Sequence, residues 1–436
     1  MMTFETAKGV KDWYGKDAIM RNHIRETLRQ IFESYGYNPI ETPIIETQKA
    51  LGFKGGGEIQ KEVFKLSDQG GRELALRFDH TVPLARFFAS HNDIKLPFKR
   101  YAIGEVFRDG PTQVEQGRYR IFTQCDIDVL GIKEMTAEME IFFLARDAFL
   151  KLGLGDVEVK INNRKVLDGI ISYVEIPSQI HNKAISILDK MDKIGLEGVK
   201  KELLDIKGPE NISEEKVDRL TSMISREMTN EATYNKLLKS LVKNTGLEEI
   251  KQVLDYSKKL NLDFIQFDPS LARGLDYYTG TTIEVYLKDK ELLKSAIVAG
   301  GRFDNMIGDF RNERQEVPAV GISFGLERIL TVLQKKSEKF KKNVSDIYII
   351  PIGDTKYDCL GICQELRKQN LNVDMHHTKS KRIGDIISYA DSTGIRYVGF
   401  LGETEIKEHS ITLKNLQNEN QKTVQIEDVY NEIKIL

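Results

Sequence analysis

The chain has 436 residues with a formal net charge of −2, and 40% of them are hydrophobic and 30% charged, which predicts two or three soluble globular domains. The small net charge excludes a generally basic, non-specific nucleic-acid binder, although one local basic face would suffice for a specific partner. Three cysteines exclude a disulfide framework and favour a reducing, cytoplasmic compartment.

No targeting or membrane segment is expected. The chain contains no run of about 18 apolar residues, the minimum for a membrane-spanning helix. The beginning, MMTFETAKGVKDW, has no apolar stretch and carries early acidic residues, so we expect no signal peptide.

The first predicted elements are a helix and a strand marked by prolines. Residues 17–36 read as a helix with Asp17 as its N-cap and Gly36 at its end. Its apolar residues share one face: Ile24, Leu28, Ile31, Phe32 and Tyr35. The following YNPIETPIIET cannot be helical, because Pro39 and Pro43 each remove a backbone donor and favour extended neighbours.

A long hairpin is predicted at 98–131. YAIGEVFR and RYRIFTQCDIDVLG alternate like strands, and DGPTQVEQG between them is rich in turn-forming residues. A helix follows at about 134–152. Residues from about 165 to 262 are rich in Lys, Glu and Ile, and we expect a helical insertion there.

Strand patterns return with LDYYTGTTIEVYL, followed by AGGRFD, which reads as a glycine-rich turn, and by a strand-helix unit in VPAVGISFGLERIL. The polar, basic segment 331–343 is predicted to be a linker. Beyond it, residues 344–436 alternate between strands and helices and predict a compact α/β domain with a mostly parallel sheet. Cys359 and Cys363 lie four residues apart in one of these helices, where a buried helix face is a simpler interpretation than a metal or redox pair.

No sequence motif for binding nucleotides through the backbone is present, because the chain lacks a P-loop and a glycine-rich dinucleotide fingerprint. No metal-binding motif of the H-E-x-x-H or CxxC kind is found either. Several arginines nevertheless lie at strand ends and beside glycines, and together they suggest a clamp for a polyanion, since guanidinium groups match phosphate and carboxylate oxygens. These are Arg108, Arg118, Arg120, Arg273, Arg302 and Arg328.

At this point the residues resemble a known family. PIIET around Pro43, FRDGPTQVEQGRYRIFTQCD and GISFGLER resemble, in this order, the three signature motifs of class II aminoacyl-tRNA synthetases. ARGLDYYTG and AGGRFD resemble the two peptides peculiar to the histidyl-tRNA synthetases, and KGVKD and LRFDHTVPLAR also look like that family. The resemblance extends over essentially the whole chain.

The resemblance implies a fold of several α/β domains. Residues 1–330 would form a class II catalytic core, an antiparallel sheet of six or seven strands with flanking helices and the helical insertion. Residues 344–436 would form an anticodon-binding α/β domain. The resemblance also implies a homodimer built through the first motif, with Pro43 and the helix at 17–36 at the interface. For Pro43, a simple strand-end proline is the alternative.

The resemblance further implies the reaction and its arginines. The carboxylate of L-histidine attacks the α-phosphorus of ATP, giving histidyl-adenylate and pyrophosphate, and histidine then passes to the 3′ end of its tRNA. Fixed cations stabilise the charge in the transition state. By resemblance, Arg108 bridges the histidine carboxylate and the α-phosphate, Arg273 is the catalytic arginine at the α-phosphate, Arg118 contacts ATP and Arg328 holds the γ-phosphate. Mg²⁺ is expected beside the pyrophosphate, although the sequence contains no metal motif.

Histidine selection is assigned by the same resemblance. Asp79, Thr81 and Gln124 match acceptors for the α-ammonium group, with His80 beside them. Asp128 and Tyr278 match the residues on either side of the imidazole, and Tyr277 lines the pocket. An analogue that cannot pair would leave buried polar groups unsatisfied, which is costly. The simpler alternatives are a surface acid for Asp128, a helix cap for Asp79 and core packing for the tyrosines.

The chain departs from the family pattern at three positions. Gly110 stands where a glutamate usually reads the adenine amino group, so Asp109, Glu115 or the backbone would have to replace that contact. Lys8 replaces a common arginine, and Phe303 replaces a common tyrosine.

Two other functions compete with the ligase. One is a non-catalytic paralogue of the same fold, of the kind that regulates the first enzyme of histidine synthesis. Such proteins commonly lack the tail domain and the catalytic arginine, whereas this chain has Arg273, Arg328 and residues 344–436. The other is a pure RNA-binding module, for which the ATP-site arginines would have no purpose. In the tail, Lys379, Lys381 and Arg382 could meet the tRNA backbone, or could be a solvated loop.

Overall fold

The structure is a computed structural model that describes residues 4–52, 61–206, 211–274, 277–311, 316–336, 340–378 and 382–434. The chain divides into two compact units. The larger comprises Met1–Lys11 and Ile24–Lys336, and the smaller comprises Asp12–His23 and Ser337–Leu436. None of the helices in these ranges is long and apolar enough to cross a membrane.

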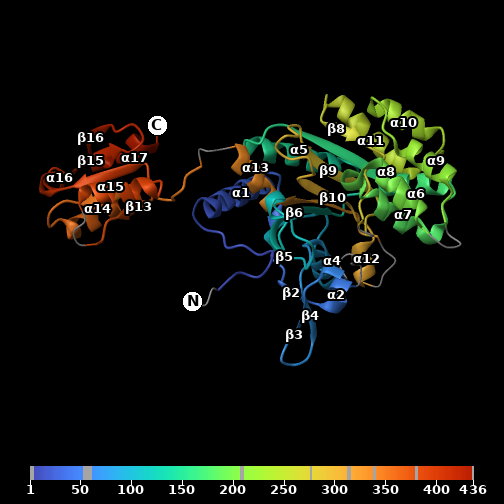
Figure 1. The fold of residues 1–436 in the computed structure, drawn as a ribbon, viewed down its shortest axis with the longest axis horizontal. Helices are drawn as coiled ribbons and strands as arrows, with labels where there is room; N and C mark the ends of the chain where they lie inside the picture. Colours follow the sequence, from blue (N-terminus) through green and yellow to red (C-terminus); the bar gives the residue numbers. More distant parts are fainter. Residues whose placement is uncertain are drawn as a thin grey trace. The chain divides into compact units, whose positions relative to one another are not determined.

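The larger unit is built on an eight-stranded sheet in the order β1-β5-β6-β11-β10-β9-β7-β8. Figure 1 labels β5, β6, β8, β9 and β10 of this sheet. From β5 to β7 every neighbouring pair is antiparallel, whereas β1 and β8 pair in parallel at the two edges. The predicted antiparallel sheet is confirmed at the centre, and short parallel edge strands make the whole sheet mixed. The strands are β1 (Asn38–Pro39), β5 (Phe98–Phe107), β6 (Ile121–Leu130), β7 (Val157–Asn163), β8 (Ile265–Phe267), β9 (Thr281–Leu287), β10 (Val298–Arg302) and β11 (Ala319–Gly325).

Helices α1 (Gly15–Ser34) and α5 (Thr136–Lys151) cover one face of this sheet. The ring of Phe32 on α1 lies 5.7 Å from that of Tyr101 on β5 and 5.6 Å from that of Phe324 on β11. Phe149 on α5 lies 5.9 Å from the same Phe324. The apolar face predicted for the first helix therefore packs against the sheet, as expected. The predicted N-cap is wrong, because α1 begins at Gly15 and Asp17 lies in its first turn, where an acid still complements the helix dipole.

A small antiparallel sheet in the order β2-β4-β3 precedes the hairpin. Its strands are β2 (Ile45–Thr47), β3 (Lys65–Ser67) and β4 (Glu73–Leu76), and the short helix α2 (Gln48–Gly52) follows β2. Helix α4 (Thr81–Ser90) leads into the hairpin, and α12 (Met306–Arg311) packs beside it. Of these elements, the sequence predicted the extended segment around Pro43 and, as the alternative for Asp79, the start of a helix where α4 begins.

The span predicted as an insertion is helical in its described part, and Figure 1 draws it in green to yellow beside the sheet. The helices are α6 (Arg164–Tyr173), α7 (His181–Leu188), α8 (Met191–Leu204), α9 (Glu214–Ile224), α10 (Asn230–Leu238) and α11 (Thr245–Lys259), with a short 3-10 helix η2 (Ser178–Ile180).

The structure corrects two predictions near the end of this unit. AGGRFD is not a turn, because its glycines belong to strand β10. A Cβ atom at Gly300 would lie 2.0 Å from the carbonyl oxygen of Gly321, so glycine is needed there for the close approach of two strands. Helix α13 (Leu326–Lys336) also extends into the predicted linker, because Val332 and Leu333 are buried and continue its apolar face.

The smaller unit has a five-stranded sheet in the order β13-β12-β14-β15-β16. Only the pairs of β12 with β13 and with β14 are parallel, so the prediction of a mostly parallel sheet is wrong. The last two strands return through short connections and therefore pair antiparallel. Cys359 and Cys363 are buried and free, as a helix face predicts. The elements are β12 (Ile347–Pro351), α14 (Lys356–Lys368), β13 (Val373–Met375), α15 (Ile383–Ser392), β14 (Tyr397–Leu401), α16 (Glu403–Lys407), β15 (Ser410–Asn415), β16 (Gln421–Gln425), η3 (Ile426–Asp428) and α17 (Val429–Lys434).

Candidate active site

The candidate site lies on the sheet face opposite α1 and α5. Side chains alternate between the two faces of a strand, so Gln124, Asp126 and Asp128 on β6 share one face. Asp128 is the register partner of Arg100 on β5 and of Gly321 on β11. Strands β5, β6 and β11 therefore bring buried polar side chains from distant parts of the sequence onto one surface.

Two glycines form the floor beside Asp128. Gly301 on β10 and Gly321 on β11 are register partners. A Cβ atom at Gly321 would lie 2.0 Å from Oδ1 of Asp128, and one at Gly301 would lie 2.8 Å from Cδ1 of Tyr278. The carboxylate and the phenol ring thus lie over neighbouring glycines, and a side chain at either glycine would displace one of them.

The predicted aromatic residues lie together here. The rings of Tyr277 and Tyr278 are 4.8 Å apart, and Tyr277 also contacts Phe303 at 6.3 Å. Burial raises the pKa of both tyrosines, so both hydroxyl groups are neutral. Leu275 and Asp276 of the ARGLDYYTG segment lie outside the described residues.

Asp79 caps helix α4, which was the simpler alternative for this residue. Its Oδ1 accepts hydrogen bonds from the backbone N–H groups of Thr81 at 3.1 Å and Val82 at 3.0 Å. Burial nevertheless raises the pKa of Asp79. Next to it, Nε2 of His80 lies 3.2 Å from the carbonyl oxygen of Gly104. Burial and nearby arginines lower the pKa of His80 to about 3, so its ring is neutral.

Other polar atoms on this surface have unused hydrogen-bonding capacity. Gln124 donates through Nε2 to Oγ of Ser323 at 2.9 Å, but no described residue pairs with its buried Oε1. The same holds for Oδ1 of Asp126 and Nδ1 of His80. Burial raises the pKa of Asp126 to about 7 and that of Asp128 to about 6. Buried acceptors without partners, as on Gln124 and Asp126, suit a ligand that brings several N–H donors.

Positive charge gathers at the other end of this surface. Burial lowers the pKa of Arg328, and so do the charges of Arg118, Arg273 and Arg108 against the opposing effect of Glu284, which places these three arginines within electrostatic reach of Arg328. Arg328 donates to the carbonyl oxygen of Ala296 at 2.5 Å. Clustered guanidinium groups repel each other unless an anion joins them, so a polyphosphate fits this position.

Two of these arginines are oriented by specific neighbours. Arg273 forms an ion pair with Glu284 at 2.7 Å, and this carboxylate, acting against burial, raises the pKa of Arg273. The guanidinium of Arg108 stacks over Phe78 at 4.1 Å and lies 5.2 Å from the ring of Phe122.

The loop after Arg108 is contacted by a residue that sequence reasoning missed, Glu62. The carboxylate of Glu62 lies against Gly110, because a Cβ atom there would be 2.5 Å from Oε2 of Glu62. The backbone N–H of Asp109 donates to the carbonyl oxygen of Glu62 at 2.7 Å. Asp109 itself pairs with Arg120 at 3.2 Å, and Glu115 is exposed in the 3-10 helix η1 (Val114–Gln116). No local motif links residue 62 to this loop, so the sequence held no signal for it.

Arg302 is not part of the arginine cluster. It is 1% exposed, lies on the opposite face of the sheet from Gly301, and donates to both carboxylate oxygens of Glu138 at 2.8 Å. The context beside two glycines was misleading, because neighbouring residues on a strand point to opposite faces. Conversely, Arg100, Asp126 and Glu284 are on the site face and were not predicted. The alternation of Gln124, Asp126 and Asp128 was a usable signal for Asp126.

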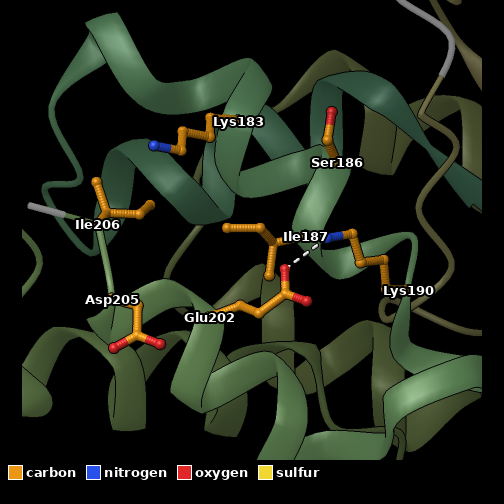
Figure 2. Close-up of a pocket in the computed structure, with 7 residues that line it drawn as sticks. All are labelled: Lys183, Ser186, Ile187, Lys190, Glu202, Asp205 and Ile206. Atoms are coloured by element: carbon orange, nitrogen blue, oxygen red, sulfur yellow. Dashed lines mark hydrogen bonds and ion pairs between the residues drawn. The ribbon is translucent and has the colours of Figure 1, made fainter. Parts of the chain in front are cut away.

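A separate pocket of about 340 Å³ lies in the helical insertion, at α7 and α8. Figure 2 shows its side chains and the ion pair between Lys190 and Glu202, which measures 2.6 Å. None of the predicted site residues lines this pocket. Its lining residues are Lys183, Ser186, Ile187, Lys190, Glu202, Asp205 and Ile206.

No group of three or more His, Cys, Asp or Glu side chains in the described part of the chain could hold a metal ion. In the tail, the predicted RNA contacts Lys379 and Lys381 lie outside the described residues. Arg382 stands directly before α15, which begins at Ile383.

Comparisons with known proteins give one consistent result. Residues 9–329 match the family model described as histidyl-tRNA synthetase, and residues 346–436 match an anticodon binding domain. Histidine--tRNA ligase 1 of Bacillus cereus is 38% identical over 431 residues, which cover 98% of each chain.

Solved structures agree in fold. The crystal structure of histidyl-tRNA synthetase from a Nostoc species covers 100% of both chains with a TM-score of 0.84 and 31% identity. A structure titled as an ATP phosphoribosyltransferase regulatory subunit/histidyl-tRNA synthetase, from Bacillus halodurans, covers 92% of this chain and 98% of its own with a TM-score of 0.74. It is 20% identical, so that likeness concerns the fold alone.

Proposed function

The chain belongs to the histidyl-tRNA synthetase family, and from this membership we propose that it is a histidine–tRNA ligase. It activates L-histidine with ATP to histidyl-adenylate and pyrophosphate, and then transfers histidine to the 3′ end of its tRNA. One observation carries the assignment to this site. Asp128 and Tyr278 lie together over Gly321 and Gly301, and Arg328, near the other end of this surface, is within electrostatic reach of Arg118, Arg273 and Arg108.

Histidine would bind at the acidic end of the surface. Asp128 and Tyr278 would pair with the two ring nitrogens, and Tyr277 would line the pocket. The α-ammonium group would pair with Gln124, whose Oε1 has no partner among the described residues, and with Asp79 and Thr81 at the start of α4. Because His80 is neutral and holds the carbonyl oxygen of Gly104, it would shape this wall without adding charge.

ATP would bind at the arginine end. Arg108 would bridge the histidine carboxylate and the α-phosphate, and Arg273 would stabilise the charge that grows on the α-phosphate oxygens. Its ion pair with Glu284 supports this role, because the pair orients the guanidinium before the substrates arrive. Arg118 and Arg328 would hold the outer phosphates.

Adenine recognition falls to a residue outside the usual motif. Glu62 presents a carboxylate where the side chain of residue 110 would lie. We therefore propose Glu62 as the acceptor for the adenine amino group. Asp109 is a weaker candidate because Arg120 already engages it.

Mg²⁺ would arrive with ATP as part of the substrate. The described residues offer no cluster of acids for a resident ion. Mg²⁺ in phosphoryl-transfer sites is commonly held by substrate phosphates and only one or two carboxylates, so this donor set suits a nucleotide-bound ion.

Two copies of the chain would form a homodimer through the segment around Pro43. The exposed fractions of Ile44 and Ile45 are 44% and 52%, and that of Leu66 in the same small sheet is 37%. Neighbouring apolar side chains exposed in this way support a contact surface. Sedimentation of the full chain tests the dimer.

The tail, residues 344–436, would bind the anticodon region of the tRNA, and the match of residues 346–436 to an anticodon binding domain supports this. The reaction would take place in the cytoplasm, where charged tRNA is used. Histidine-dependent exchange of pyrophosphate into ATP, followed by charging of tRNA, tests the assignment. A non-catalytic paralogue or an RNA-binding module would show no exchange.

A further inference from the structure

A buried arginine that the proposed mechanism does not use lies against the histidine end of the site. Arg100 is 0% exposed. Its Nη2 lies 2.5 Å from Oδ2 of Asp128 and donates to the carbonyl oxygen of His80 at 3.2 Å. Both contacts come from residues at the proposed histidine pocket, on different elements of the fold.

This arginine is costly for the fold. Its Nε and Nη1 are buried and have no partner among the described residues. Burying guanidinium donors without partners opposes folding, and an apolar residue of similar size would fill the same volume at less cost. A role at the site explains why the position holds an arginine.

The contact with Arg100 separates the two oxygens of Asp128. Oδ2 faces the guanidinium, whereas Oδ1 lies over the floor at Gly321, on the side toward β10 and Tyr278. The charged groups that act on Asp128 are the acids Asp79 and Asp126 and the cation Arg100. Asp128 in turn raises the pKa values of Tyr37 and Tyr278. Arg100 is the only cation among these groups in the described residues.

We propose that Arg100 is a positioning residue for histidine recognition, which engages one oxygen of Asp128 so that the other is held, ionised, where the imidazole N–H arrives. This inference rests on the proposed function. Arg100 does not touch the substrate in this scheme and acts through Asp128 alone.

Steady-state pyrophosphate exchange on the full chain tests this with two substitutions. Arg100→Leu removes both the positive charge and the planar guanidinium group. We expect it to raise the KM for histidine about tenfold or more, because the charge-assisted hydrogen bond between the imidazole N–H and Asp128 is weakened. We expect the KM for ATP to change by less than about twofold. Arg100→Lys keeps the charge and should restore part of the loss.

Arg302→Lys is the matched control. It replaces the guanidinium group of another buried arginine–carboxylate pair, Arg302 and Glu138, which lies on the opposite face of the sheet. It should lower the melting temperature without raising the KM for histidine selectively. An equal rise of both KM values in the Arg100 variants, as in a variant that is merely unstable, would overturn the proposal.

The pH dependence separates positioning from packing. Arg100 lowers the pKa of Asp128, so its loss moves ionisation of Asp128 to higher pH. The ratio of kcat/KM for histidine between Arg100→Leu and wild type should therefore rise from about pH 6 to about pH 9, while the same ratio for Arg100→Lys stays flat. A flat ratio for Arg100→Leu would contradict the proposal. If the wild type itself shows no histidine-dependent exchange, the proposed function fails instead.

Discussion

The carboxylate of Asp128 lies directly over Gly321, where a Cβ atom would stand 2.0 Å from Oδ1 and 2.5 Å from the carbonyl oxygen of Ile127. Gly321→Ala should therefore displace Asp128 and weaken histidine binding by about a hundredfold, since backbone on one side prevents relief. The KM for histidine in pyrophosphate exchange measures the effect. The control is Gly325→Ala on the same strand face, where the nearest contact of a Cβ is an ordinary 3.7 Å. If both variants had the same KM for histidine, the position of Asp128 would not depend on the glycine at 321.

Arg273→Ala should abolish adenylate formation while histidine still binds. Loss of a cation at the α-phosphate costs several kcal/mol, by analogy with oxyanion donors at about 3–4 kcal/mol. Exchange assays measure the first effect and calorimetric titration with histidine measures the second. Glu284 keeps a hydrogen bond from the hydroxyl of Tyr286 at 2.5 Å, so the fold should survive the change. Near-normal exchange in this variant would refute the assignment.

Asp128→Asn and Tyr278→Phe should each weaken histidine binding far more than ATP binding, because each removes one partner of the imidazole. Titration with each ligand separately is the measurement. The advantage of the wild type over Asp128→Asn should shrink as the pH falls through about 6, since burial raises the pKa of Asp128 to about 6 and the protonated acid is a weaker acceptor. Equal losses for ATP and histidine would mean that these residues only support the fold.

Glu62→Gln should raise the KM for ATP several-fold, because replacing a charged acceptor by a neutral amide weakens a hydrogen bond by about 1 kcal/mol. The KM for histidine should not change. Glu115→Gln, on an exposed acid of the loop that Glu62 contacts, is the control and should leave both values unchanged. If Glu115→Gln alone raises the KM for ATP, the adenine contact belongs to that residue.

A variant ending at Lys336 should retain pyrophosphate exchange and lose most tRNA charging. The tail has hydrophobic clusters of its own on both sides of its sheet, around Ile349 and Ile350, so neither part needs the other for its core. Both activities are measured on a truncated protein whose oligomeric state matches that of the full chain. Unchanged charging would show that the tail does not recognise tRNA.

The central hairpin could be predicted because β5 and β6 are ten residues each and alternate clearly around a turn-rich loop. The strand β3 could not, because Lys65–Ser67 is short and fully exposed, and only its pairing with β4 identifies it. Glycines in β10 suggested a turn, whereas their actual role is close packing against β11 and Tyr278. The local sequence pattern therefore predicts where the chain forms strands and turns, but it does not predict how closely two neighbouring strands pack.

In the candidate site, too, sequence motifs identified some residues, whereas others could be found only from contacts between distant segments. Family motifs led to Arg108, Gln124 and Asp128, and the structure places Gln124 and Asp128 on one face of β6 and Arg108 directly after its partner strand β5. They did not lead to Arg100, because only strand register reveals that it is the partner of Asp128. Glu62 was also missed, since its approach to Gly110 depends on a loop contact between distant segments.

Both carboxylate oxygens of Glu327 accept the backbone N–H of Thr123, at 3.2 and 3.0 Å, and the next residue is Arg328. Helix α13, which carries Arg328, the proposed phosphate contact, is thus hydrogen-bonded to strand β6, which carries Gln124 and Asp128. Thermal motion of β6 would carry the proposed contacts of both substrates in the same direction. The distance between the attacking carboxylate oxygen of histidine and the α-phosphorus of ATP would then vary less than the position of either substrate. The protein could keep this distance within a narrow range without being rigid as a whole.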